Sequence, residues 1–103
     1  MTYRLIVRPL AESDLADTFA WYESRREGLG RGFQLAVDEA FDRIQLNPFA
    51  YPKVEGEVRR AVLKRFPYNI FYLIRDNDVI VLGVIHGHRD PQVWKSKISR
   101  HEE

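Results

Sequence analysis

Histidine and aspartate gather in one short run near the C-terminal end, His86-Gly87-His88-Arg89-Asp90. The spacing His-x-His-x-Asp is used by some dinuclear zinc hydrolases, whose sites need further His or Asp ligands from other loops. The remaining histidine, His101, lies in a polar tail, and little chain is left to build a second ligand loop. We therefore expect no metal site and no cofactor. His86 should end a buried strand, and His88 should lie in the turn after it.

A second group of candidates is the stretch from Val58 to Arg75, which contains five basic residues and no acidic one: Arg59, Arg60, Lys64, Arg65 and Arg75. Successive side chains of a strand point to opposite faces, so each adjacent pair places one cation on either face. Arginine suits bidentate contacts with carboxylates and phosphates. Charge on an edge strand also protects against aggregation. A binding surface and a protected edge are both consistent with this stretch.

Covalent catalysis finds no support, because the chain has no cysteine and no serine in a Gly-x-Ser-x-Gly context. Metal-free RNA cleavage remains chemically possible. It needs a base for the 2′-hydroxyl, a cation for the phosphorane and an acid for the leaving oxygen. His86 or His88 could act as the base. Arg59 or Arg65 could supply the cation, and Tyr68 the acid.

The elements that position these residues follow from hydrophobic spacing. Residues 3–8 predict a strand that Pro9 ends. One face of a first predicted helix, which could begin as early as Leu10, is formed by Leu15, Phe19 and Tyr22. A second helix, ended by Asn47-Pro48, is predicted from apolar residues that share one face: Phe33, Val37, Ala40, Phe41 and Ile44. The glycines between them indicate a helical hairpin. Residues 49–57 should form a loop.

The second half of the chain predicts three strands, at residues 58–66, 69–75 and 79–86. Pro67 suggests that the first is bent or at an edge, whereas the last is apolar on both faces and should be central. The order β-α-α-β-β-β predicts an α+β fold of two layers, in which the helical hairpin covers one face of an antiparallel meander. We expect residues 1–103 to form one domain. The helices should leave the other sheet face uncovered, and Leu63, Phe66 and Tyr68 lie on or near a strand that could present apolar surface there.

The composition and net charge exclude several classes of function. The 103 residues carry 16 basic and 15 acidic side chains, a formal net charge of +1, which argues against a general nucleic-acid coat. The longest apolar run, residues 79–85, is too short to span a bilayer. Without a signal peptide or cysteine, the chain is expected to be cytoplasmic, with no membrane partner and no direct sequence-specific DNA binding.

Two patterns carry a resemblance to a known family: Phe-Pro-Tyr-x-Ile-x-Tyr at residues 66–72 and His-x-x-Arg-Asp-Pro-x-x-Trp at residues 86–94. Together with the hairpin at residues 11–22 and 33–48, they resemble the ParE/RelE superfamily of type II toxin–antitoxin toxins. The second pattern looks particularly like the ParE, plasmid-stabilisation branch. The resemblance spans nearly the whole chain.

The resemblance implies a small toxin that causes growth arrest and is neutralised by a cognate antitoxin, with which it could form a hetero-oligomer. ParE-type members poison DNA gyrase, and RelE-type members are ribosome-dependent endoribonucleases that cut messenger RNA. RelE-type nucleases tend to carry a catalytic arginine at the position of Asn69 and a tyrosine near Trp94. Neither residue here supplies those groups, so we favour the gyrase-directed branch, without catalytic residues.

The alternative is a RelE-type ribonuclease that uses His86, His88, Arg65 and Tyr68. For contacts with the target or partner we expect five residues: Arg59, Arg60, Arg65, Arg89 and Trp94. An antitoxin segment could cover the exposed sheet face by strand addition or as a helix in a groove.

Overall fold

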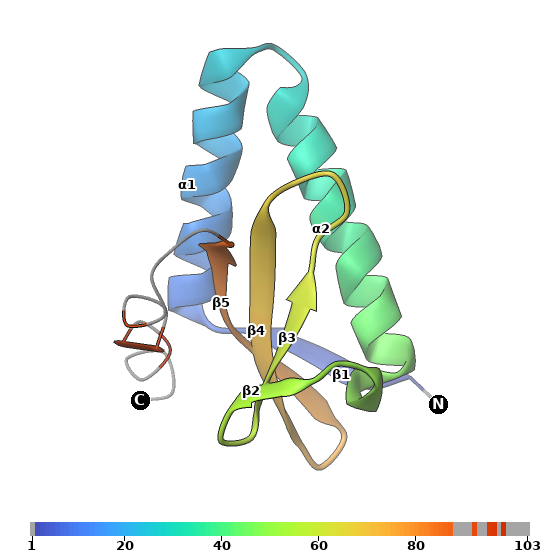
Figure 1. The fold of residues 1–103 in the computed structure, drawn as a ribbon. Helices are drawn as coiled ribbons and strands as arrows, with labels where there is room; N and C mark the ends of the chain where they lie inside the picture. Colours follow the sequence, from blue (N-terminus) through green and yellow to red (C-terminus); the bar gives the residue numbers. More distant parts are fainter. Residues whose placement is uncertain (1, 88–91, 93–94, 97, 99–103) are drawn as a thin grey trace.

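The computed structural model describes residues 2–87, 92, 95, 96 and 98, which form a five-stranded sheet and a helical hairpin on one of its faces (Figure 1). In chain order the elements are β1 (Arg4–Val7), α1 (Pro9–Arg25), α2 (Leu29–Leu46), the 3-10 turn η1 (Pro48–Ala50), β2 (Lys53–Glu55), β3 (Val58–Val62), β4 (Tyr68–Arg75) and β5 (Asp78–His86). The predicted α+β fold of two layers is confirmed.

The sheet has the strand order β1-β5-β4-β3-β2. The strands β3, β4 and β5 form the expected antiparallel meander, with β4 and β5 paired from Tyr68–His86 to Arg75–Asp78. The N-terminal strand β1 lies parallel to β5, which makes β5 an inner strand. Along its first half β5 has a strand on either side, and apolar side chains pack on both of its faces. This burial accounts for its continuous apolar sequence.

The prediction of a loop at residues 49–57 is wrong. It contains η1 and the strand β2, which pairs antiparallel with β3 through Lys53–Arg59 and Glu55–Val58. A three-residue strand whose only apolar side chain is Val54 gives too short an alternation to be recognised. The strand β3 also ends at Val62 and not at Phe66, because the chain turns before Pro67.

The two helices begin and end at recognisable residues. Pro9 occupies the first turn of α1, where a missing N–H costs nothing. Gly28 has a φ of 89°, which favours glycine, and it precedes α2. The carboxylate of Glu23 accepts hydrogen bonds from the N–H groups of Gly28 and Gly30, so it stabilises the turn between the helices. Among the described residues, no helix is long and apolar enough to cross a membrane.

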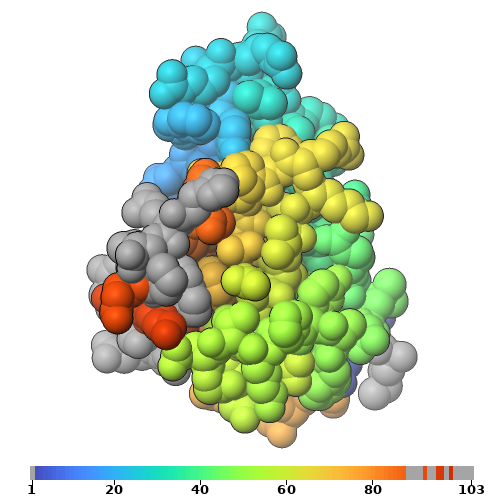
Figure 2. All heavy atoms as spheres, in the orientation of Figure 1, coloured from blue at the N-terminus to red at the C-terminus, as the bar shows by residue number. Residues whose placement is uncertain are grey.

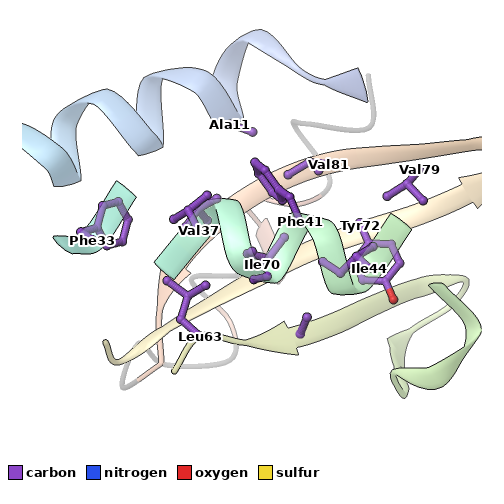
Figure 3. Close-up of a cluster of buried hydrophobic side chains, with 13 residues drawn as sticks. Ala11, Phe33, Val37, Phe41, Ile44, Leu63, Ile70, Tyr72, Val79 and Val81 are labelled. Atoms are coloured by element: carbon purple, nitrogen blue, oxygen red, sulfur yellow. The ribbon is translucent and has the colours of Figure 1, made fainter. Parts of the chain in front are cut away.

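The main core lies between the hairpin and the sheet. The side chains predicted to share one face of the second helix are all buried there: Phe33, Val37, Ala40, Phe41 and Ile44. Figure 3 labels four of them, Phe33, Val37, Phe41 and Ile44. They point toward the strands, where they contact Ile70, Tyr72 and Val81. This packing fixes the distance between α2 and β3, the two elements that border the candidate site.

The opposite face of the sheet carries a second buried cluster: Val58, Phe71, Leu73, Ile80, Leu82, Ile85 and Ile98. The expectation that Leu63, Phe66 and Tyr68 present apolar surface on this face is wrong. Leu63 belongs to the core beneath the hairpin, and Phe66 and Tyr68 pack against that core. Ile98 is a buried member of the cluster on the far face.

The carboxylate of Asp14 links α1 to an incompletely paired part of β5. Its Oδ2 accepts a 3.1 Å hydrogen bond from the N–H of Val84, whereas β1 pairs with β5 only as far as Val81. We expect Asp14→Ala to lower the free energy of unfolding by about 1 kcal/mol, because the partly buried N–H loses this acceptor. Urea unfolding would measure it, with the exposed Asp17→Ala as control at below about 0.5 kcal/mol. Equal effects of the two substitutions would contradict the assignment.

Candidate partner-binding site

The two arginines that begin the basic stretch lie on opposite faces of β3, as alternation predicts. Arg59 pairs with Tyr72 on the face that the hairpin covers, and Arg60 pairs with Phe71 on the other face. The guanidinium of Arg59 donates hydrogen bonds to the carbonyls of Tyr51 and Phe49 and lies 5.3 Å from the centre of the Phe49 ring. Arg59 thus holds the segment before β2, a structural role that leaves it less suited to a partner.

Arg60 has a different environment. Its Nε is buried and, in the part of the chain that the structure describes, has no hydrogen-bond partner. A buried guanidinium N–H without an acceptor is costly, so Arg60 is a candidate for contact with a partner. Arg60 lines a pocket of about 380 Å³ at the sheet edge, which we call the edge groove; its lining residues are Arg43, Tyr51, Pro52, Arg60, Val62 and Lys64.

A second pocket, of about 530 Å³, lies between the start of α2 and the turn after β3. Figure 2 shows this turn, in yellow, against the blue-green first part of α2. Arg26 and Arg65 line the pocket together with the apolar side chains of Leu29, Leu35 and Phe66. Glu27 and Glu39 line this pocket as well, so charged side chains of both signs surround an apolar floor, an arrangement that suits an amphipathic segment of another protein.

An ion pair connects the two pockets. In α2, the Oε1 atom of Glu39 lies 3.3 Å from Nζ of Lys64 and 3.1 Å from Nη1 of Arg43. Glu39 lines the second pocket and Lys64 the edge groove, so the pair lies at their boundary. Exposed ion pairs of this kind contribute little to stability and can be exchanged for contacts with a partner.

Two of the four residues proposed for RNA cleavage lie together. Tyr68 and His86 are direct partners across β4 and β5, and their rings are 5.1 Å apart. Tyr68 also contacts Tyr22 and Phe33, and burial raises the pKa of the Tyr22 hydroxyl. Arg65 lines the second pocket beside Phe66, whose ring contacts Tyr22 and Phe33.

Three predicted residues, His88, Arg89 and Trp94, lie outside the described residues. The described residues contain no group of three or more histidine and carboxylate side chains that could hold a metal ion. Asn69, at the position matched to a catalytic arginine, is a buried amide near the start of β4.

Sequence reasoning missed Arg43, Tyr51 and Glu39. The spacing of Glu39 and Arg43 shows an i,i+4 ion pair on a helix, but it does not show that Lys64 joins them. That contact depends on how α2 lies across the sheet. Tyr51 was missed because residues 49–57 were interpreted as a plain loop.

The backbone of Arg65 is strained, because its φ of 70° lies in the left-handed region that glycine adopts freely. We expect Arg65→Gly to be more stable than Arg65→Ala by about 1 kcal/mol, although both remove the same guanidinium. Thermal unfolding of the two variants would measure the difference. Equal stability would show that the turn relaxes and is not strained. A residue other than glycine that keeps such a strained backbone is often found at a functional site.

Comparisons with known proteins agree with this arrangement. The family model of the ParE toxin of the type II toxin–antitoxin system parDE matches residues 5–91. The toxin ParE2 of Mycobacterium tuberculosis is 31% identical over 100 residues, which cover 96% of this chain and 95% of that protein. The chain belongs to the ParE toxin family, and it is a toxin of a type II toxin–antitoxin system.

Solved structures show the same fold. A chain of the chromosomal ParDE system from P. aeruginosa has a TM-score of 0.72 at 18% identity, over 82% of this chain and 96% of that chain. A mutant of the E. coli toxin RelE in the free state has a TM-score of 0.71 at 18% identity, over 97% of this chain and 98% of that chain. The two branches of the superfamily share this architecture, so the fold by itself does not identify a target.

Proposed function

We propose that the toxin acts on DNA gyrase by binding to it, without being an enzyme itself, and that a cognate antitoxin neutralises it in a hetero-oligomer in the cytoplasm. The membership of the ParE family carries the proposal. The buried amide of Asn69 supports it, because an amide cannot supply the positive charge that phosphoryl transfer requires.

The accessible cations provide the contacts. Arg65 stands exposed on the strained turn beside an apolar pocket, and Arg60 is one of the residues that line the edge groove. Arginine beside apolar surface is typical of residues that dominate binding between proteins. Arg89 and Trp94, which follow β5, remain part of the proposed contact set.

The test is a supercoiling assay with purified gyrase and the full chain freed of antitoxin. We expect micromolar toxin to inhibit supercoiling or to trap cleaved DNA, and we expect prior addition of the antitoxin to abolish the effect. Arg65→Ala should weaken inhibition by about tenfold, given the usual cost of removing a central arginine contact. Normal supercoiling at micromolar toxin would overturn the proposal for that gyrase.

A ribosome-dependent messenger-RNA endoribonuclease is the second candidate. The observation that favours it is the direct pairing of Tyr68 and His86, an acid and a base whose ring centres are 5.1 Å apart. Primer extension on translated messenger RNA decides between the two. Codon-phased cuts that disappear with His86→Ala would establish the ribonuclease, and intact messenger RNA at toxic expression levels would exclude it.

A further inference from the structure

We propose that the tip of the helical hairpin binds the phosphate backbone of duplex DNA, through Arg25, Arg26 and Arg31 and without reading the base sequence. The hairpin tip comprises residues 21–31, which are the end of α1, the turn and the start of α2. Figure 1 shows this turn, in cyan, projecting beyond the ends of the strands, and Figure 2 shows its atoms at one extremity of the molecule. A projecting tip can approach the groove of a duplex, whereas a single strand is usually held in a groove of the protein.

The three arginines of the hairpin tip are exposed, and their side-chain donors are not engaged by neighbouring residues. None of the three forms a side-chain hydrogen bond or an ion pair within the part of the chain that the structure describes. The ion pairs found there use other cations: Arg4, Arg43, Lys53, Lys64 and Lys95. A guanidinium with free donors suits bidentate contact with a phosphate.

The acidic residues of the hairpin tip offset these cations only in part. The carboxylate of Glu23 accepts 3.0 Å hydrogen bonds from the N–H groups of Gly28 and Gly30, so it faces the turn. Glu27 is the exposed acidic residue of the tip. The outward-facing charge is therefore three arginines against one carboxylate, and this local field attracts a polyanion although the whole chain has a net charge of +1.

Trp21 holds Arg25 in an orientation that suits contact with a phosphate. Cζ of Arg25 lies 4.7 Å from the centre of the Trp21 ring, which itself packs against Tyr22 with ring centres 5.0 Å apart. The N–H groups of a guanidinium lie in its plane, so stacking on an aromatic face leaves them available at the rim. The stacked side chain also loses less freedom when it meets a ligand.

The backbone of the hairpin tip is fixed by close packing between the two helices. A Cβ atom on Gly30 would lie 2.8 Å from the carbonyl oxygen of Phe19, which is closer than a side chain allows. The hydrogen bonds of Glu23 close the same turn. The arginines therefore extend from a rigid support, which lowers the entropy cost of binding.

The hairpin tip offers little apolar surface for a protein partner. Trp21 is 50% exposed, but Arg25 covers one face of its ring. Tyr22 and Leu29 are half-buried. Interfaces between proteins usually have an apolar core, whereas protein–DNA interfaces are more polar and much more positively charged. The composition of the tip therefore favours DNA over an acidic protein surface.

The experiment measures, by fluorescence anisotropy, the binding of the full chain, freed of antitoxin, to a labelled DNA duplex of random sequence. We expect a Kd of about 10 μM at about 50 mM salt, with a log–log slope of the association constant against salt of about −2.7, as for three phosphate contacts. Substitution of each arginine of the tip by glutamine should raise the Kd about fivefold and make the slope shallower by about 0.9. Glu27→Gln should lower the Kd about twofold.

Two further variants separate the hairpin tip from general charge and from packing. Arg75→Gln removes an exposed cation at the end of β4 away from the tip, so it should change the Kd by less than about 1.5-fold. Trp21→Leu should raise the Kd about threefold in the original chain and have no further effect in Arg25→Gln, because the ring acts through Arg25. Equal losses in both backgrounds would overturn this positioning role. Thermal unfolding of each variant confirms that the fold is retained.

The outcomes separate the inference from the proposed function. A Kd unchanged by the three arginine substitutions, or an equal loss with Arg75→Gln, would overturn the inference. Equal competition by poly-glutamate would assign the hairpin tip to an acidic protein instead, and binding of single-stranded RNA about tenfold tighter than duplex would assign it to RNA. Inhibition of gyrase by a chain that does not bind DNA would overturn the inference and leave the proposed function standing. DNA binding without inhibition of gyrase would support the inference and overturn the proposed function.

Discussion

Replacing Phe33 with alanine is expected to lower the free energy of unfolding by about 3–5 kcal/mol, the usual range for a fully buried aromatic residue. Phe33 of α2 is completely buried, and its ring lies 5.5–5.6 Å from the rings of Tyr22, Phe66 and Tyr68. It therefore connects α1, the turn after β3 and β4. Since small domains are stable by about 5–15 kcal/mol, this one change removes a large share of the total.

Urea unfolding monitored by far-ultraviolet circular dichroism would measure the effect. The matched control is Leu35→Ala, two residues along α2, where the side chain is 55% exposed and the expected change is below about 0.5 kcal/mol. A shift in midpoint with an unchanged slope would show a pure loss of stability. A loss below about 1 kcal/mol for Phe33→Ala would contradict the packing of the hairpin on the sheet.

Tyr72→Phe is expected to destabilise the chain by about 1–3 kcal/mol at pH 7. The hydroxyl of Tyr72 is buried and donates a 2.6 Å hydrogen bond to the carbonyl of Pro48, at the start of η1. Phenylalanine fills nearly the same volume but leaves that carbonyl without its donor. The loss should also loosen the segment that leads from α2 to β2, which contributes Tyr51 and Pro52 to the edge groove.

Burial raises the pKa of the Tyr72 hydroxyl well above its usual value, and this predicts a pH dependence. In the unfolded chain a tyrosine loses its proton near about pH 10, whereas in the folded chain Tyr72 keeps it. Above that pH the unfolded state binds fewer protons than the folded state, so stability falls as pH rises, by up to about 1.4 kcal/mol per pH unit. Below that pH the group adds no pH dependence.

The difference between the original chain and Tyr72→Phe isolates this effect, since Tyr22, whose pKa is also raised, is present in both. We expect the difference in stability to stay constant between about pH 7 and pH 9 and to shrink above about pH 10. Tyr3→Phe, at a half-buried ring, serves as the control and should change stability by less than about 0.5 kcal/mol. A difference that grows above pH 10 would contradict a protonated, buried Tyr72.

The sequence was sufficient to predict the two helices and the three strands of the meander, because their apolar side chains repeat with clear periods. The five apolar positions that share the predicted face of α2 are all buried: Phe33, Val37, Ala40, Phe41 and Ile44. The strand β2 was not predictable, because its three residues take their stability from pairing with β3. The burial of the second sheet face was also missed, since Ile98, which packs there, follows no periodic pattern of apolar residues.

The candidate site was predicted in part. The basic residues were found from their run along the chain, and Arg60 and Arg65 do line pockets. The run did not show which of these basic residues stabilise the fold. Arg59 donates to the carbonyls of Phe49 and Tyr51, which belong to a segment without a periodic pattern of apolar residues. The positive φ of Arg65 also has no sequence signal, since arginine rarely adopts it.

The most direct test of a gyrase-directed toxin is pulse-labelling of DNA synthesis and protein synthesis in the minutes after the chain is induced without its antitoxin. The account predicts that DNA synthesis falls first, while protein synthesis continues and messenger RNA stays intact. Co-expression of the antitoxin should restore DNA synthesis. An immediate fall in protein synthesis, with codon-phased cuts in translated messenger RNA and continuing DNA synthesis, would contradict the account.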